Sequence, residues 1–215
     1  MNSNSQTRTK PGQERSRATL QSIMTASASL IAEYGLDAVS MTQIANVAGM
    51  SKASLYRYFP NKQALLLAHA ERSFNVHREE MKAAMQHGAE PEQMLRDGID
   101  HYCKQHTDNP FLLNLRAAIH ADPVLSELDL KDSRENAALL AVFLREHYPE
   151  LDSVIIETRS LLTMELMDSL ARLVARVPKQ EQMRLIDEFV RLFFADLSHW
   201  LKNQSSSSLS LKFPI

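Results

Sequence analysis

The chain has little of what several classes of protein need. Its 215 residues include one cysteine, five glycines and one tryptophan. A single thiol cannot form a disulfide within the chain, which fits a reducing compartment. No apolar run reaches the roughly 18 residues that cross a bilayer, and the polar first residues lack the apolar core of a secretory signal. We therefore expect a cytoplasmic protein that has no membrane partner.

Charge is unevenly distributed along the chain, although the net charge is only −2. Residues 1–70 hold seven lysines and arginines against three acids, whereas the rest holds 17 against 23. A basic N-terminal part joined to an acidic body indicates an anionic partner for the first part only. Charge alone leaves chance clustering open as the alternative.

The spacing of apolar residues predicts an all-α fold of about nine helices. No stretch alternates apolar and polar residues as a strand would, and apolar residues recur at helical intervals. The first amphipathic helix is expected to end at Tyr34-Gly35, and the others to cover 41–48, 52–58, 62–87, 91–106, 111–120, 123–147, 151–177 and 179–202. The predicted organisation is a disordered arm at 1–13, a helix-turn-helix domain at 14–62, a larger helical domain at 63–203 and a flexible tail at 204–215.

Residues 40–62 have the pattern of a helix-turn-helix. Ser40 opens a capping-box sequence, Gly49 can supply the positive φ of the turn, and Ser51 can cap the next helix. The stretch SKASLYRYFPNK at 51–62 then puts small residues at the leading end of a short helix, with basic and phenolic side chains around it. A helix that enters the major groove of DNA needs this combination.

Residues 17–66 resemble the DNA-binding domain of the TetR family of transcriptional regulators. The residues that carry the resemblance are Ala28, Tyr34-Gly35, Ile44-Ala45, Ala48-Gly49, Ser51, Leu55-Tyr56, Phe59, Lys62 and Leu65-Leu66. The resemblance implies a homodimer whose all-helical body holds a ligand pocket. It also implies a repressor that leaves its DNA operator when a small-molecule effector binds.

The resemblance also assigns the contacts with double-stranded DNA. Tyr56 and Lys62 match residues that hold phosphates, and the other matching positions approach bases or backbone. The full set is Thr42, Gln43, Lys52, Ala53, Ser54, Tyr56, Arg57, Tyr58 and Lys62. Core packing is the expected role of Phe59 and the alternative role of Tyr58. The basic arm at 8–17 is expected to be a solvated tail, and insertion into an adjacent minor groove is its alternative.

The last predicted helix, 179–202, is apolar over most of its circumference. Such a helix must be buried on nearly all sides, which a terminal helix in a chain of this size is not expected to achieve alone. Together with the apolar face of 161–177, it predicts a four-helix interface between two copies, and burial within one chain is the alternative. The interface candidates are Leu162, Leu166, Leu170, Phe189, Phe193, Leu197 and Trp200.

The larger domain is expected to enclose an apolar cavity for a small apolar or amphipathic effector. The lining candidates are Phe74, His77, Tyr102, Phe111, Arg116, His120, Met164 and Met167. Arg116 stands in the otherwise apolar segment FLLNLRAAIH, where it would meet a ligand carboxylate or an internal acid such as Asp168.

Other classes of function have less support in the sequence. His101, Cys103, His106 and His120 lack the spacing of a known metal site, so no metal is expected. The chain has no glycine-rich phosphate loop and no GxSxG motif, so neither a cofactor nor an enzymatic activity is expected. A helical scaffold that binds DNA without sequence preference, or binds another protein, is the alternative function.

Overall fold

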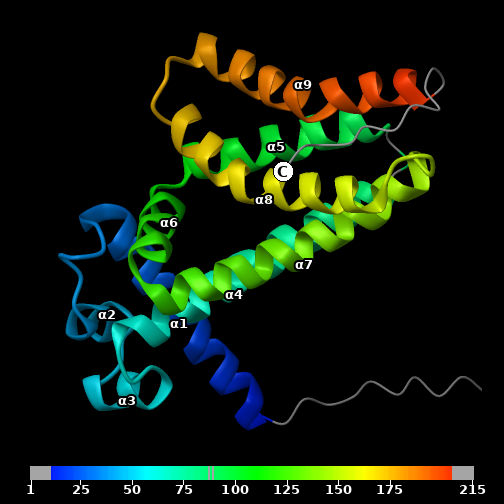
Figure 1. Cartoon of the computed structure of the whole chain (residues 1–215). Helices are drawn as coiled ribbons and strands as arrows, with labels where there is room; N and C mark the ends of the chain where they lie inside the picture. The colour runs from blue at the N-terminus through cyan, green and yellow to red at the C-terminus, as the bar shows by residue number, and fades with distance from the viewer. Residues whose placement is uncertain (1–10, 87, 89, 205–215) are drawn as a thin grey trace, which may run out of the picture. The chain divides into compact units, whose positions relative to one another are not determined.

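The computed structural model describes residues 11–86, 88 and 90–204, with side chains at 14–86, 88 and 90–194. Over these ranges the chain forms nine helices and no strand, which confirms the all-α prediction (Figure 1). None of these helices combines the length and the apolar character that a membrane span requires. The helices are α1 Pro11–Tyr34, α2 Met41–Val47, α3 Lys52–Tyr58, α4 Lys62–Gln86, α5 Pro91–Asp108, α6 Pro110–Ala121, α7 Pro123–His147, α8 Ser153–Val174 and α9 Lys179–Gln204.

Most helix boundaries follow the local signals in the sequence. Gly35 directly after α1 and Gly49 two residues after the end of α2 adopt φ values of +78° and +69°, in the left-handed region that glycine enters without strain. Helix α8 begins two residues later than predicted because the Asp152 side chain accepts a hydrogen bond from the Val154 amide at 2.7 Å and so fixes the start at Ser153. It ends at Val174, before the predicted end at 177.

Helix α1 begins earlier than predicted. Residues 11–13 were expected to belong to a disordered arm, but they form the first turn of α1. Proline is well placed there, because the first helical position has no hydrogen-bond partner for its amide within the helix. Glu14 adds a negative charge to the same turn, where the helix dipole favours it. The predicted disorder of 1–10 and of 205–215 concerns positions outside the described residues.

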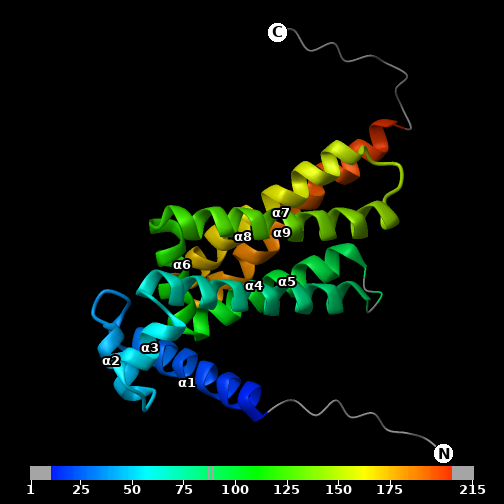
Figure 2. The same ribbon diagram turned by 90° about the horizontal axis from the view of Figure 1, so that it is seen from below.

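The chain divides into two compact units. The first contains the chain as far as Arg72 and also Pro110–Leu125, so it includes α1, α2, α3, the start of α4 and α6. The first unit thus extends beyond the predicted domain boundary at residue 62, because α6 packs against α1. Helix α2 contacts both α1 and α3, and Figure 2 shows the three together.

The core of the first unit is formed by aliphatic side chains from α1 to α4. Ile23, Ile44, Leu55 and Leu65 are wholly buried. A buried polar contact joins α1 to α4, since His69 Nε2 lies 2.8 Å from Ser27 Oγ.

The second unit contains the rest of α4, α5, most of α7, and α8 and α9. Helix α5 contacts both α8 and α9, which also contact each other. Arg78 on α4 pairs with Asp132 and Glu135 on α7, and it donates to Asn136 at 3.1 Å. Burial raises the pKa of the Asp132 carboxyl above its usual value although Arg78 opposes that shift.

Candidate nucleic-acid interface and ligand cavity

Helix α2 is held in place by reciprocal hydrogen bonds at its start. The Gln43 amide donates to Ser40 Oγ at 3.3 Å, and the Ser40 amide donates to Gln43 Oε1 at 2.8 Å. The predicted capping box is therefore confirmed. Thr42 and Gln43 are both exposed at this end of the helix. The Gln43 carboxamide oxygen is used by the cap, which leaves its NH2 group as the donor for a DNA contact.

The turn between α2 and α3 fixes the orientation of α3. The Gly49 amide donates to the Asn46 carbonyl at 3.2 Å, and the Met50 amide donates to the Ala45 carbonyl at 3.0 Å. Ser51 then accepts a hydrogen bond from the Ser54 amide at 3.1 Å and so caps α3. Leu55 is wholly buried and anchors the inward face of α3 in the core.

The outward face of α3 carries the predicted DNA contacts. Lys52, Ala53, Tyr56 and Arg57 are exposed, whereas Ser54 and Tyr58 are half-buried. The Lys52 ammonium lies 5.7 Å from the centre of the Tyr56 ring, within reach of a cation–π interaction. The next residue, Phe59, is 6% exposed, as expected for a core residue. The outward face thus combines cationic, phenolic and small side chains, as the major groove requires.

Lys62 is tied to the loop after α1. Its ammonium donates to the Leu36 carbonyl at 2.8 Å. An ammonium has three protons, so this bond leaves two for a phosphate. Asn61 accepts a hydrogen bond from the Ala64 amide at 2.7 Å and caps α4. Lys62 therefore stands at the capped N-terminus of a helix, where negative charge is favoured.

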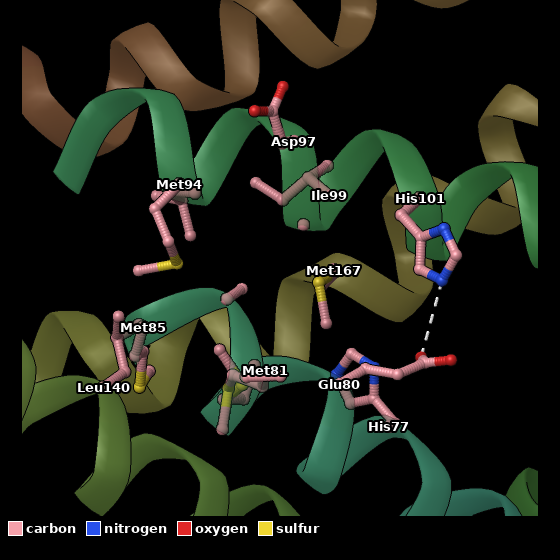
Figure 3. Close-up of a pocket in the computed structure, with 15 residues that line it drawn as sticks. His77, Glu80, Met81, Met85, Met94, Asp97, Ile99, His101, Leu140 and Met167 are labelled. Atoms are coloured by element: carbon pink, nitrogen blue, oxygen red, sulfur yellow. Dashed lines mark ion pairs between the residues drawn. The ribbon is translucent and has the colours of Figure 1, made fainter. Parts of the chain in front are cut away.

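The second unit encloses a cavity of about 470 Å³ among α4, α5, α7 and α8 (Figure 3). This volume lies within the range of roughly 300–1,000 Å³ that is common for small-molecule sites. The lining residues are His77, Glu80, Met81, Ala83, Ala84, Met85, Met94, Leu95, Asp97, Gly98, Ile99, His101, Leu140, Met164 and Met167. Three of the predicted lining residues, His77, Met164 and Met167, are among them.

Two further candidates, Phe74 and Tyr102, are buried in the second unit but are not among the lining residues. The Tyr102 ring centre lies 5.0 Å from that of His77 and 4.1 Å from that of His106. Its hydroxyl lies 3.5 Å from Asp168 Oδ1, and Asp168 also accepts from Arg172 at 2.7 Å. Tyr102 therefore belongs to the packing beside the cavity.

The remaining three candidates, Phe111, Arg116 and His120, lie on α6. That helix belongs to the first compact unit, whereas all the lining residues belong to the second. The Phe111 ring packs against His69, with ring centres 4.7 Å apart. The sequence prediction grouped these side chains with the cavity because it could not foresee that α6 packs on α1.

Several lining residues were not singled out as candidates, notably Glu80, Met81, Met85, Met94 and His101. Helical spacing from an identified residue could have found two of them. Met81 and Met85 follow the candidate His77 by four and eight positions on α4. Residues at these intervals share one face of a helix.

The predicted dimer residues on α8 and α9 divide between the surface and the core. Leu162 and Leu166 are 52% and 50% exposed on α8. In contrast, Leu170 and Phe193 are buried in the core of the second unit, and Phe189 is half-buried against it. Burial within the chain therefore accounts for part of the apolar character of α9. The side chains of Leu197 and Trp200 lie outside the described ones.

Within the part of the chain that the structure describes, no three or more His, Cys, Asp or Glu side chains cluster as metal ligands would. Cys103 is buried, and burial raises the pKa of its thiol to about 12. A thiol in this state is protonated at neutral pH and is a poor nucleophile and metal ligand.

Both parts of the chain match known family models. Residues 23–69 match the family model described as bacterial regulatory proteins of the tetR family. Residues 89–201, more than half of the chain, match the model described as a tetracyclin repressor-like C-terminal domain.

Relatives and solved structures agree with these matches. An uncharacterised HTH-type transcriptional regulator of Mycobacterium tuberculosis is 29% identical over 168 residues, which cover 78% of this chain and 81% of the relative. The HTH-type transcriptional repressor KstR of the same organism is 28% identical over 188 residues, covering 86% and 84%. The TetR-family repressor FadR of Thermus thermophilus, solved in complex with lauroyl-CoA, has the same fold, with a TM-score of 0.62, 20% identity and coverage of 91% and 98%. The two family matches and the helix-turn-helix geometry show that the chain belongs to the TetR family of bacterial transcriptional regulators, which are DNA-binding proteins and not enzymes.

Proposed function

We propose that the chain is a repressor that binds a pseudo-palindromic DNA operator as a homodimer. It leaves the operator when a small apolar or amphipathic effector occupies the cavity of the second unit. The proposal rests on the presence of two features in one chain. The capped helix α3 exposes Lys52, Tyr56 and Arg57, and the second unit holds a methionine-lined cavity. Because the chromosome lies in the cytoplasm, the protein acts there.

The proposed DNA contacts fall into two kinds. Tyr56 and Lys62 grip phosphates, which positions the protein without reading sequence. Lys52 and Arg57 reach base edges from the exposed face of α3, and Ala53 and Ser54 allow close approach. Thr42, Gln43 and Tyr58 complete the contact surface at its margins. The relative KstR is named a repressor, which supports repression rather than activation.

The proposed dimer uses the exposed apolar residues of α8. Leu162, Leu166 and Leu173 recur at intervals of four and seven and are 52%, 50% and 46% exposed. An exposed apolar stripe of this kind marks an interaction surface, and a two-fold axis through it would pair the same stripe on both copies. A dimer supplies two copies of α3, which two half-sites of a pseudo-palindrome require.

The proposed response to effector depends on α4. Residues 62–72 of this helix belong to the first unit, and the remainder, including His77 and Met81 at the cavity wall, belongs to the second. An effector that favours one position of α4 would change the spacing of the recognition helices. It must bind the DNA-free state more tightly, since equal affinity for both states shifts nothing. FadR, which has a similar fold, is solved with lauroyl-CoA bound, which supports an apolar or amphipathic ligand.

A scaffold that grips phosphate or an acidic protein without reading sequence is the second candidate, because the balance of +4 in residues 1–70 would serve either partner. Selection of genomic DNA fragments by the purified full-length protein at near-physiological salt separates the two. We expect enrichment of one pseudo-palindromic site. Fragments retained without sequence preference, and lost as salt rises, would overturn the repressor proposal in favour of the scaffold.

Variants at the interface test the division of contacts. Arg57→Ala should weaken operator binding by about 1–3 kcal/mol per half-site and relax the base preference at one position. Lys62→Ala should weaken binding to all sequences alike and lower the salt dependence. Lys82→Ala is the matched control, because Lys82 is a lysine of the second unit that pairs with Glu79. A change in base preference caused by Lys62→Ala would show that its phosphate assignment is wrong.

A charge on α8 tests the dimer. Leu166→Glu should raise the dimer dissociation constant by more than tenfold, because the two-fold axis puts the new carboxylate into the interface twice. Val142→Glu on α7 is the control, since Val142 is 49% exposed, close to the 50% of Leu166, but lies on another helix. Sedimentation of both variants over a range of concentrations measures the effect. The α8 interface would be contradicted if both substitutions raised the dimer dissociation constant equally, or if neither raised it.

A further inference from the structure

The cavity in the second unit has a one-sided charge. Of the lining residues within the described part of the chain, Glu80 and Asp97 are acids, and none is a lysine or an arginine. The imidazoles of His77 and His101 are its other titratable groups, and the remaining lining residues are apolar or glycine. An anionic ligand would therefore meet a carboxylate and, among these residues, no permanent cation, whereas a cationic ligand would meet a partner.

The Glu80 carboxylate lies at the end of the cavity that holds the two histidines. Glu80, His77 and His101 lie together there, and Asp97 points away from the methionine sulfurs (Figure 3). Glu80 Oε2 lies 3.5 Å from His101 Nε2, and the Gln105 amide donates to both Glu80 oxygens at 3.3 Å. A carboxylate offers about four acceptor sites, and these contacts are long. Glu80 can therefore accept a short hydrogen bond from a ligand.

Nearby cations are engaged elsewhere. Arg78 on α4 pairs with Asp132 and Glu135, and Arg96 on α5 pairs with Asp187. Both arginines lie on helices that line the cavity, but their guanidinium groups are committed to carboxylates in other directions. The negative charge of Glu80 is therefore not offset by either of these arginines.

The apolar part of the cavity indicates the shape of the ligand. Its walls include five methionines, which adapt to flexible or irregular apolar molecules. They are Met81, Met85, Met94, Met164 and Met167. Among the lining residues that the structure describes, none is a phenylalanine, tyrosine or tryptophan. Quaternary ammonium ligands are bound by aromatic cages, so the absence of aromatic lining favours a cation that donates a hydrogen bond instead.

On the basis of the function proposed above, we propose that the cavity takes an amphiphilic amine. Its protonated amino group donates N–H to the Glu80 carboxylate, and its apolar chain or ring system lies along the methionines. This class differs from lauroyl-CoA, which is bound in the structure of the relative FadR. The phosphates of lauroyl-CoA would need cationic partners.

A set of probes with one tail and four head groups tests the proposal. Decylamine, decanol, decanoate and decyltrimethylammonium are titrated calorimetrically into the full-length protein, below the concentrations at which they form micelles. We expect decylamine to bind at least about tenfold more tightly than each of the others. Equal or tighter binding of decanoate or of the quaternary ammonium would overturn the proposal, as would no binding of decylamine.

Glu80→Gln is the matching variant. It should lower the affinity for decylamine towards that for decanol and so remove the preference between the two. Glu79→Gln is the control, since Glu79 neighbours Glu80 on α4 but is exposed and pairs with Lys82. Each variant is judged by the ratio of its two affinities, because a loss of folding lowers both. Glu80→Lys replaces the carboxylate with a cation and should reverse the preference, so that decanoate binds more tightly than decylamine. A preference that survives in Glu80→Gln would contradict the role of this carboxylate.

Release from DNA is measured separately with the selected operator fragment. Decylamine that binds the cavity and releases the operator supports both proposals. Decylamine that binds with the expected preference but leaves the operator complex intact supports the ligand class and contradicts the proposed effector response. Release by decanoate alone supports the response and overturns the ligand class.

Discussion

The two compact units differ in how their apolar residues are packed. In the first unit, side chains such as Ile23, Ile44 and Leu55 are wholly buried and fill the interior. The second unit leaves about 470 Å³ open and lines it with five methionines. A filled core holds a surface in one geometry, whereas a cavity with flexible walls can adjust to a ligand. The same chain thus uses tight packing for recognition of DNA and loose packing for recognition of a small molecule.

The units also differ in how they treat buried polar groups. In the first unit, Ser27 Oγ lies 2.8 Å from both the Ile23 carbonyl oxygen and His69 Nε2, and burial lowers the pKa of His69 to about 4. The buried imidazole is therefore neutral at pH 7. In the second unit, half-buried Arg78 pairs with buried Asp132. The core of the first unit therefore excludes charge, and that of the second accommodates it.

Matched truncations test the difference in packing and should give the largest effect. Leu55→Ala should lower the free energy of unfolding by about 3 kcal/mol, because the filled core cannot collapse onto the space left. Met85→Ala at the cavity wall should cost only about 1 kcal/mol, since Met85 is half-buried and already borders open space. Urea unfolding followed by circular dichroism measures both.

Equal costs for the two truncations would remove the contrast in packing between the units. The two variants should also separate by activity. Leu55→Ala should weaken operator binding, because Leu55 anchors α3 from within. Met85→Ala should leave operator binding unchanged and alter only the affinity for cavity ligands.

The buried histidine of the first unit should give a pH-dependent effect of similar size. Burial lowers the pKa of His69 from 6.5 to about 4 in the folded protein. The stabilisation is therefore complete above pH 6.5 and is lost as pH falls towards 4, because the unfolded chain then binds a proton that the folded one does not. The loss should be on the order of 3 kcal/mol.

His69→Gln should remove this part of the pH dependence, since glutamine does not titrate. Unfolding free energies measured between pH 7 and pH 4 give the slopes. The wild-type protein should have the steeper slope, and the His69 variant should have a shallower one. A His69→Gln slope equal to that of the wild type would contradict the role given to the buried imidazole.

The sequence predicts the first unit better than the second because its signals are local. Ser40, Gly49 and Ser51 each act on the next three or four residues, so the caps and the turn of the helix-turn-helix follow from short stretches of chain. Exposure of the face of α3 follows in turn, since the burial of Leu55 fixes which side of a seven-residue helix points inward.

The cavity depends on long-range packing, which periodicity does not reveal. Its lining comes from four helices, and a helical pattern shows which residues share a face but not which helix that face meets. Phe111 and Arg116 illustrate this limit. Their apolar segment resembles a cavity wall, yet α6 packs on α1 in the first unit. Met81 and Met94 show the converse, because a lone methionine in a helical stripe is indistinguishable from ordinary core.

Loss of a helix cap should give the smallest effect on stability and still separate the units. Ser40→Ala and Asp152→Ala each remove a side chain that accepts a hydrogen bond from a backbone amide at the start of a helix. Each should cost about 1 kcal/mol of unfolding free energy. The consequences for function should differ, because α2 has seven residues and α8 has 22.

A seven-residue helix has too few internal hydrogen bonds to form without its cap and its neighbours. Ser40→Ala should therefore loosen α2, displace Thr42 and Gln43, and weaken operator binding by several-fold beyond what its small stability cost implies. Asp152→Ala should fray only the first turn of α8, far along the helix from Met164 and Met167, and leave both operator and cavity binding unchanged. Operator affinity and ligand affinity measured on both variants decide the matter. Equal loss of operator binding in the two would mean that overall stability, and not the local geometry of α2, limits recognition of DNA.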